Sequence, residues 1–200
     1  MIRRLPRYYR QLTELCNRGI VRISSHSLGQ EMNITASQIR QDFSCFGEFG
    51  QQGYGYNVKA LRAQIASILG IDRQYSVILV GAGKIGQSLI ENIHFDNYGF
   101  RFLGAFEIRK EMVGTKIAGV PIMDAETQDA FIRENDVDIA ILSVNRDRAQ
   151  HVANILIASG IHAIWNFTDI EIDAGDSGVV VENMHFSDSL LALSYFLSSK

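Results

Sequence analysis

The sequence predicts an α/β protein in two parts: a small N-terminal helical part, then a doubly wound parallel sheet. Two observations lead to this fold class. Residues 5–46 hold short segments with apolar positions at helical spacing, joined by tight turns. From residue 76 onward, short apolar runs alternate with helical segments, as expected for parallel strands covered by helices on both faces. With 46% hydrophobic and 20% charged residues, the composition is that of an ordinary globular protein.

The N-terminal part has the pattern of a helix-turn-helix. Apolar positions over 5–16 follow helical spacing, and Gly19 ends the run. A second helix is expected over 25–32, with Ser24 or Ser25 as its N-cap. Thr35 opens a third helix that extends to about residue 46, and Thr35 and Gln38 have capping-box spacing. The turn between these two helices is about three residues long, the length of a helix-turn-helix.

A glycine-rich segment follows the third helix. Residues 47–56 read GEFGQQGYGY, and their four glycines indicate a hairpin or wing. Asn57 then caps a helix that Gly70 ends, and residues 71–75 form a linker. We therefore expect a winged helix-turn-helix domain over residues 1–73.

Charge is distributed unevenly between the two parts. Residues 1–70 hold nine basic and four acidic side chains, a net charge of +5, whereas the remaining residues carry −8. A basic segment joined to an acidic body suggests that only the first part faces a polyanion. Polar groups at the start of the third helix suit base edges, and basic groups nearby suit phosphates. The candidate DNA-binding residues are Arg7, Arg10, Ser37, Gln38, Arg40, Gln41, Gln51, Gln52 and Tyr54.

The second part begins with a dinucleotide-binding pattern. The run VILVGAGKIG places Gly81, Gly83 and Gly86 in GxGxxG spacing, directly after a strand and at the start of a helix. Glu107 ends the next strand, where a carboxylate can accept hydrogen bonds from the adenosine ribose. These features predict a Rossmann-like domain over 76–184 that binds NAD or NADH. Arg109 leaves NADP open, although Glu107 would repel its 2′-phosphate.

The remaining features point away from catalysis, metals and membranes. The histidines are scattered, and Cys16 and Cys45 have no metal-binding spacing, so we expect no catalytic residue, no metal site and reduced thiols. His94 and His185 are the two histidines that could approach a nicotinamide. There is no signal peptide pattern and no run long enough to span a membrane, which predicts a cytoplasmic protein. Residues 185–200 form a helix that is apolar on nearly all sides, so a second subunit is its expected cover.

Taken together, these stretches resemble the Rex family of bacterial redox-sensing repressors. The resemblance spans the chain and is carried by RYYRQLTEL, by SSHSLGQEMNITASQIRQDFSCFGEFGQQGYGY, by LVGAGKIG, by ILSV and GVVVEN, and by the closing helix. It implies a homodimer that exchanges its C-terminal helices, binds operator DNA without cofactor or with NAD⁺, and is released by NADH. The cofactor contacts it implies, together with those predicted from the motif, are Gly81, Ala82, Gly83, Lys84, Ile85, Gly86, Glu107, Arg109, Ser143, Val144, Asn145 and Asn166.

The chain departs from the family pattern in places. Glu107 stands where relatives commonly have Asp, and a Tyr and an Asp that some relatives place near the nicotinamide become Ile93 and His185. Two alternative functions stay open at this point: a small NAD(P)-dependent oxidoreductase with an N-terminal arm, and a module that binds CoA or another nucleotide.

Overall fold

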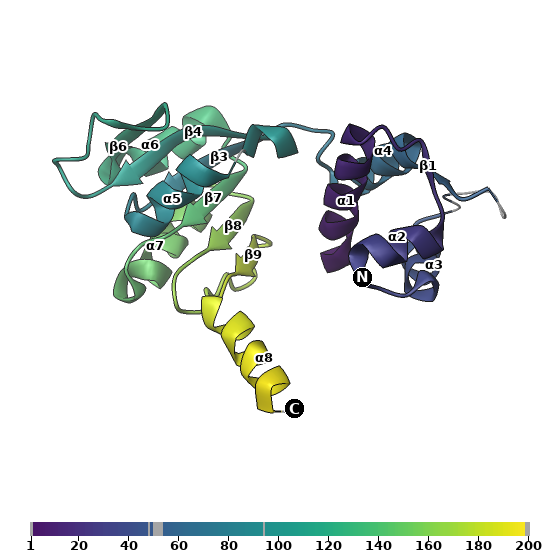
Figure 1. Cartoon of the computed structure of the whole chain (residues 1–200). Helices are drawn as coiled ribbons and strands as arrows, with labels where there is room; N and C mark the ends of the chain where they lie inside the picture. The colour runs from purple at the N-terminus through teal and green to yellow at the C-terminus, as the bar shows by residue number, and fades with distance from the viewer. Residues whose placement is uncertain (1, 48, 50–53, 94, 199–200) are drawn as a thin grey trace. The chain divides into compact units, whose positions relative to one another are not determined.

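A computed structural model describes residues 2–47, 49, 54–93 and 95–198 of the chain. The described chain divides into two compact units, one up to Arg73 and one from Gln74 (Figure 1). Each unit has its own hydrophobic core.

Unit 1 is helical, with a small two-stranded sheet. Three of its helices begin at side-chain caps that the sequence predicts: Ser24, Thr35 and Asn57 accept hydrogen bonds from backbone N–H groups three residues on. Asn33 and Gly70 adopt the left-handed conformation that ends a helix. The elements are η1 (Ile2–Arg4), α1 (Leu5–Asn17), β1 (Arg22–Ile23), α2 (Ser25–Met32), α3 (Ala36–Ser44), β2 (Tyr56–Asn57) and α4 (Val58–Leu69).

Two details of unit 1 differ from the sequence expectation. The capping box is only half formed, because the Gln38 side chain donates to Asp42 instead of returning to the Thr35 backbone. β1 pairs antiparallel with β2, and no strand is predicted at β1, because two residues are too short to show an alternating pattern. The glycine-rich segment lies mostly outside the described residues, which include only 47, 49 and 54–56 of it.

The core of unit 1 joins all its main helices. α1, α2, α3 and α4 each contribute fully or almost fully buried side chains. Phe43 of α3 is the aromatic centre, with ring contacts to Tyr8 at 4.9 Å and to Tyr56 at 5.2 Å. This packing fixes α3 between α1 and the small sheet.

Unit 2 is built on a seven-stranded sheet of order β5-β6-β4-β3-β7-β8-β9. Six strands run parallel, and β5 pairs antiparallel with β6 at one edge. The elements are β3 (Tyr75–Val80), α5 (Lys84–Asn92), η2 (Phe95–Tyr98), β4 (Phe100–Glu107), β5 (Lys116–Ile117), β6 (Val120–Asp124), η3 (Ala125–Thr127), α6 (Gln128–Asn135), β7 (Ile139–Leu142), α7 (Arg146–Ala158), β8 (Ala163–Asn166), β9 (Val180–Asn183) and α8 (Phe186–Ser198).

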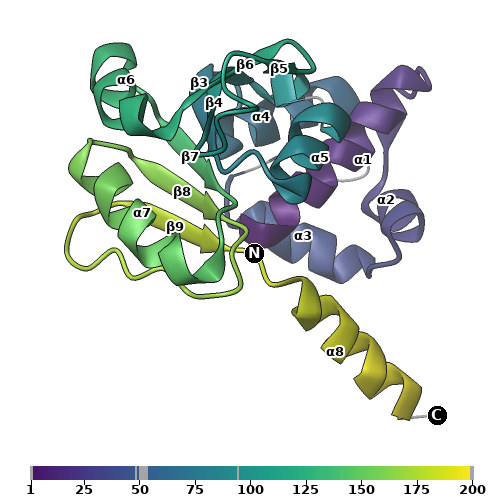
Figure 2. The ribbon, with the colours of Figure 1, turned by 90° about the vertical axis from the view of Figure 1, so that its left-hand side faces the viewer.

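Helices cover both faces of this sheet, which explains the wholly apolar central strands. Ile78 and Val80 of β3 pack on one face with residues of α6 and α7. Val77 and Leu79 pack on the opposite face with Ile90 of α5. Figure 2 shows α7 alongside β8 and β9. The order reverses at β3, because β4 lies on one side of it and β7 on the other, and such a switch point is where ligands bind in doubly wound folds.

The segment between β4 and β7 is the part of unit 2 whose elements are not predicted from the sequence. It contains β5, β6, η3 and α6. β6 has a single buried position, Ile122, among its five residues and holds a proline, so its pattern is weak as a strand signal. α6 is eight residues long, too short for a clear helical period.

α8 stands apart from the sheet. Figures 1 and 2 both show it extending from the end of β9, and no residue of α8 is buried. Among the described helices, none combines the length and the apolar character needed to cross a membrane.

Candidate functional site

The glycine-rich loop after β3 has three glycines with different structural requirements. Gly81 has φ +95°, and a Cβ there would lie 2.6 Å from the Ser143 carbonyl oxygen. A Cβ on Gly86 would lie 2.5 Å from the Gly81 carbonyl oxygen and 2.8 Å from Leu79 Cδ2. Gly83 has an ordinary φ of −73°, and a Cβ there would meet nothing within 4 Å. Protein packing therefore requires glycine at 81 and 86, whereas the space beside Gly83 is open.

The loop leads into α5, whose first N–H groups have no acceptor within the helix. Gly83 occupies the N-cap position and supplies no side chain to satisfy them. Ser143, at the end of β7, donates its hydroxyl to the Gly81 carbonyl at 2.6 Å and so fixes the loop against β7. The arrangement leaves a helix N-terminus with an uncapped, positive dipole end, which suits an anion such as a phosphate.

Glu107 is a buried carboxylate at the end of β4. Its oxygens accept hydrogen bonds from the backbone N–H groups of Ala82, Ile108 and Arg109 and from the Arg109 guanidinium, at 2.8–3.1 Å. Burial by itself raises the pKa of Glu107, but the hydrogen bonds from Arg109 and Ile108 outweigh it, and the pKa lies below its usual value. The carboxylate is thus charged and connects β4 to the glycine-rich loop.

The Arg109 guanidinium folds back over this loop. It donates to Glu107 Oε2 at 2.9 Å and to the Ala82 carbonyl at 3.0 Å. The hydrogen bond to Glu107 raises the pKa of Arg109, so the side chain stays charged. In this position its charge is directed at Glu107 rather than offered to an additional anion.

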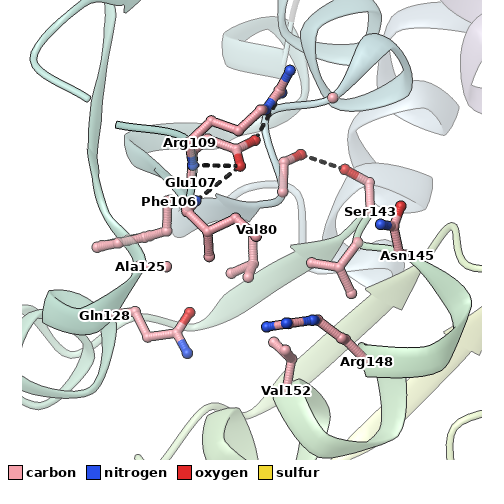
Figure 3. Close-up of a pocket in the computed structure, with 14 residues that line it drawn as sticks. Val80, Phe106, Glu107, Arg109, Ala125, Gln128, Ser143, Asn145, Arg148 and Val152 are labelled. Carbon is pink, nitrogen blue, oxygen red and sulfur yellow. Dashed lines mark hydrogen bonds and ion pairs between the residues drawn. The ribbon is translucent and has the colours of Figure 1, made fainter. Parts of the chain in front are cut away.

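These groups surround a pocket of about 410 Å³ at the carboxyl ends of β3, β4 and β7. Figure 3 shows Glu107 and Arg109 above it, Ser143 and Asn145 on one side, and Gln128, Arg148 and Val152 toward its opposite end. The volume is within the range of pockets that hold small organic ligands. The lining residues are Val80, Gly81, Gly83, Phe106, Glu107, Ile108, Arg109, Ala125, Gln128, Ser143, Val144, Asn145, Arg148 and Val152.

Seven of the twelve candidate cofactor residues line this pocket. Ala82, Lys84, Ile85 and Gly86 belong to the same loop and helix start but are not among the lining residues. Asn166 is fully buried, and its amide contacts Ile170, Asn183 and Thr168 within unit 2. The structure therefore gives Asn166 contacts that hold the chain after β8.

Two polar pocket residues were not predicted from the sequence. Gln128 begins α6, in the segment between β4 and β7 that the sequence does not predict, and Arg148 lies in the first turn of α7. A usable signal was the position of Arg148 shortly after the apolar run that ends at residue 144, because segments that follow the strands of such a sheet bind ligands. Nothing in the sequence pattern indicated Gln128.

Unit 1 presents a second candidate site on α3. Ser37, Arg40 and Gln41 are exposed, and the Arg40 guanidinium donates to Ser25 Oγ at 3.2 Å. Gln38 is only partly exposed, and its amide donates to Asp42 at 2.9 Å. The structure thus leaves three of the four α3 candidates on the surface and gives Gln38 a contact inside the unit.

The DNA-binding candidates outside α3 that the structure describes are cationic or aromatic. Arg7 and Arg10 of α1 are exposed, and Arg7 makes one long hydrogen bond of 3.5 Å to the Met32 carbonyl. Tyr54 is 70% exposed, and the Arg22 guanidinium lies 6.0 Å from its ring centre. Gln51 and Gln52 fall outside the described residues.

Asp42 holds α3 in place and was not predicted as a key residue. It is 2% exposed and accepts hydrogen bonds from Arg4 at 2.5 and 2.7 Å, from Tyr8 Oη at 2.8 Å and from Gln38 at 2.9 Å. The hydrogen bond from Arg4 lowers the pKa of Asp42 to about 2. A usable signal was its spacing, because Asp42 follows Ile39 by three residues and so shares the buried face of α3.

Comparisons with known proteins agree with this two-part organisation. A family described as "Putative DNA-binding protein N-terminus" matches residues 1–44, and one described as "CoA binding domain" matches residues 72–170. Proteins named "Redox-sensing transcriptional repressor Rex" from Clostridium novyi and Clostridium beijerinckii are 46% and 49% identical to the chain. Each match covers 99% of this chain and 94% or 93% of the relative.

Solved structures give the same result. One, described as RSP in complex with beta-NAD⁺ and operator DNA, has a TM-score of 0.92 and 48% identity, covering 99% of this chain and 91% of that one. Another, described as RSP in complex with beta-NADH, has a TM-score of 0.89 and 45% identity, covering 99% and 92%. Since sequence relatives and structures agree over nearly the whole length, the chain belongs to the Rex family of redox-sensing transcriptional repressors.

Proposed function

We propose that this chain represses transcription by binding operator DNA as a homodimer, and that NADH releases it. The single observation that carries the proposal is the full-length similarity to Rex repressors, including structures described with NAD⁺, NADH and operator DNA. These relatives are named as repressors and not as oxidoreductases, which favours the sensing function over the enzymatic alternative. We assign DNA binding to residues 1–73, cofactor binding to 76–184 and dimerisation to 185–200.

The cofactor would occupy the pocket beside the glycine-rich loop. The open space at Gly83 and the uncapped N-terminus of α5 suit the pyrophosphate. Glu107 lies where the adenosine ribose would be held, and the apolar wall of Val80, Val144 and Val152 suits the base. In this proposal the reduced dinucleotide favours release from operator DNA and the oxidised form does not. The bound dinucleotide therefore carries the redox signal.

A CoA or NADP ligand is the second candidate, because the C-terminal part matches a CoA-binding family model. Both of these ligands carry a phosphate on the adenosine ribose, close to the charged Glu107. Arg109 is engaged by Glu107 and Ala82 and so does not offer a free cation to that phosphate. We therefore expect NADH to bind more tightly than NADPH or CoA, and displacement titrations at equal concentrations test this order.

The apolar surface of α8 supports a homodimer with exchanged helices. Seven large apolar side chains of α8 are 56–73% exposed, and Val180 on the edge strand β9 is 67% exposed. An exposed apolar surface of this kind is typical of a subunit interface. In the proposal, α8 of each subunit packs on the partner's unit 2. The exposed residues of α8 are Phe186, Leu190, Leu191, Leu193, Tyr195, Phe196 and Leu197.

Release requires NADH to favour a dimer whose two α3 helices no longer match two operator half-sites. A coupling of about 2–3 kcal/mol changes operator affinity roughly 30- to 150-fold. The test selects a palindromic duplex from a random library with this protein and measures its affinity by fluorescence anisotropy. Affinity should fall with NADH and stay high with NAD⁺; equal affinity with both would remove the sensing function.

Replacing Gly83 by alanine should weaken cofactor binding without affecting the fold. The added methyl group meets no protein atom but enters the space proposed for the pyrophosphate, so NADH affinity should fall about tenfold or more. Gly86→Ala is the contrasting variant, because its Cβ would clash with Gly81 and Leu79 and should lower the thermal midpoint. Calorimetric titration and a melting curve on both variants give the two readouts. Unchanged NADH affinity in Gly83→Ala would contradict the proposed pyrophosphate position.

Replacing Arg10 by alanine should weaken DNA binding equally for all sequences. A side chain that contacts phosphate contributes about 0.9 to the slope of log affinity against log salt concentration, so the slope should fall by about one. The exposed Lys116 of unit 2 gives a matched control, because Lys116→Ala removes a cation from the other unit. If the two variants had the same salt slope as the wild type, Arg10 would make no phosphate contact.

A further inference from the structure

Gln128 is a buried polar residue that the protein itself does not satisfy. It is 6% exposed, and its carboxamide oxygen is buried with no hydrogen-bond partner among the described residues. Buried acceptors in native proteins are nearly always paired, so an unpaired one at a pocket wall calls for a ligand. The last torsion of a glutamine side chain has a broad energy minimum, so a small rotation is enough to turn the unpaired carboxamide oxygen toward a ligand in the pocket.

Arg148 faces Gln128 from the opposite wall. Figure 3 shows the Gln128 carboxamide and the Arg148 guanidinium pointing toward each other across the lower part of the pocket. The Arg148 backbone N–H donates to the Asn145 carbonyl at 3.0 Å, whereas its guanidinium has no hydrogen-bond or ion-pair partner among the described residues. Val144 and Val152 add apolar side chains to the lining of the same pocket. The space is therefore bounded by a planar cation, an amide and branched aliphatic side chains.

This combination matches a flat, hydrogen-bonding aromatic ring. An amide, with one donor and one acceptor, pairs with adenine, which offers an amino donor next to a ring-nitrogen acceptor. A guanidinium plane stacks on a base, as in proteins that bind unstacked nucleobases. Glu107 lines the other end of the same pocket, where a carboxylate can hold the ribose of the same ligand.

We propose that Gln128 reads the amino edge of the adenine base and that Arg148 stacks on that base. The inference rests on the proposed function, since it concerns the same NADH site, and it makes Gln128 the residue that selects the base. A ligand with an oxygen at position 6 would place an acceptor against the Gln128 oxygen and should bind less tightly.

Reduced nicotinamide hypoxanthine dinucleotide is the probe for this selection. Its base has a 6-oxo group in place of the 6-amino group and an N1–H in place of the N1 acceptor, while N7 stays an acceptor beside position 6 as in NADH. Wild-type protein should bind NADH about tenfold more tightly than the hypoxanthine analogue, as measured by calorimetry. Gln128→Met keeps the side-chain length and removes the amide, so it should bind both dinucleotides with similar, weaker affinity. Glu134→Gln, on the exposed side of the same helix, is the control and should keep the tenfold ratio.

Arg148→Leu separates stacking from base reading. It should weaken both dinucleotides by a similar factor of three to ten and leave their ratio unchanged. A wild-type protein that binds NADH and the hypoxanthine analogue equally would overturn the assignment of Gln128, whether or not the variants fold. Failure of the wild type to bind NADH at all would instead overturn the proposed function.

Discussion

Replacing Asp42 by alanine is expected to lower the stability of unit 1 by about 3 kcal/mol or more. The carboxylate is buried and accepts two hydrogen bonds from Arg4 and one each from Tyr8 and Gln38, so its removal leaves four donor groups without their partner. Breaking a buried ion pair by deleting one member typically costs about 3–5 kcal/mol. Urea unfolding followed by far-UV circular dichroism measures the change, and Trp165 fluorescence reports unit 2 separately.

The same variant should bind operator DNA poorly, because Asp42 lies on α3 with Ser37, Arg40 and Gln41. Asp42→Asn is the matched variant: it preserves the shape and can still accept from Tyr8 but cannot pair with the Arg4 charge. The stability and the operator affinity of Asp42→Asn should both lie between those of Asp42→Ala and those of the wild type. An Asp42→Ala protein that unfolds at the wild-type urea concentration would show that this network does not hold α3.

The acid sensitivity of unit 1 follows from the same contact. The hydrogen bond from Arg4 lowers the pKa of Asp42 from 3.8 to about 2. A carboxyl group whose pKa is lower in the folded than in the unfolded state stabilises the fold at pH values above its unfolded-state pKa. This stabilisation is lost as the pH falls through the folded-state pKa. Between pH 5 and pH 2, the free energy of unfolding of the wild type should therefore fall by about 2 kcal/mol more than that of Asp42→Asn.

Removing α8 by ending the chain after His185 is expected to convert the proposed homodimer to a monomer. No residue of this helix is buried within the single chain. We therefore expect its apolar surface to be covered by a partner subunit. A monomer holds one half-site at a time, and loss of the linked second contact should lower operator affinity roughly 10²- to 10⁴-fold. Analytical ultracentrifugation gives the mass, and anisotropy gives the operator affinity.

A point substitution makes the same test without deleting a segment. Leu191→Asp places a charge in the proposed interface and should dissociate the dimer, whereas Asp188→Asn on the same helix should not. NADH binding is the folding control, since the pocket residues lie before residue 153. A truncated chain that stays dimeric and keeps full operator affinity would contradict a role for α8 in assembly.

Much of this protein could be predicted from local sequence signals. The N-caps Ser24, Thr35 and Asn57 act on N–H groups three residues away, so the short-range pattern is sufficient to locate those helix starts. The β3 strand, the glycine-rich loop and Glu107 were predicted because packing and backbone conformation restrict the residues allowed there. Similarity over the whole chain, rather than any single motif, determined the family.

Other features depend on contacts between residues far apart in the sequence. Asp42 pairs with Arg4 across 38 positions, and Gln128 meets the pocket only because α6 packs beside β3 and β7. β5, β6 and α6 are too short to show a period of their own, and the tertiary fold stabilises them. The sequence by itself therefore determined the helix starts, the central strands and the glycine-rich loop, whose causes are local. The tertiary structure decided which polar side chains are buried and which line the pocket, because burial depends on what the rest of the chain places nearby.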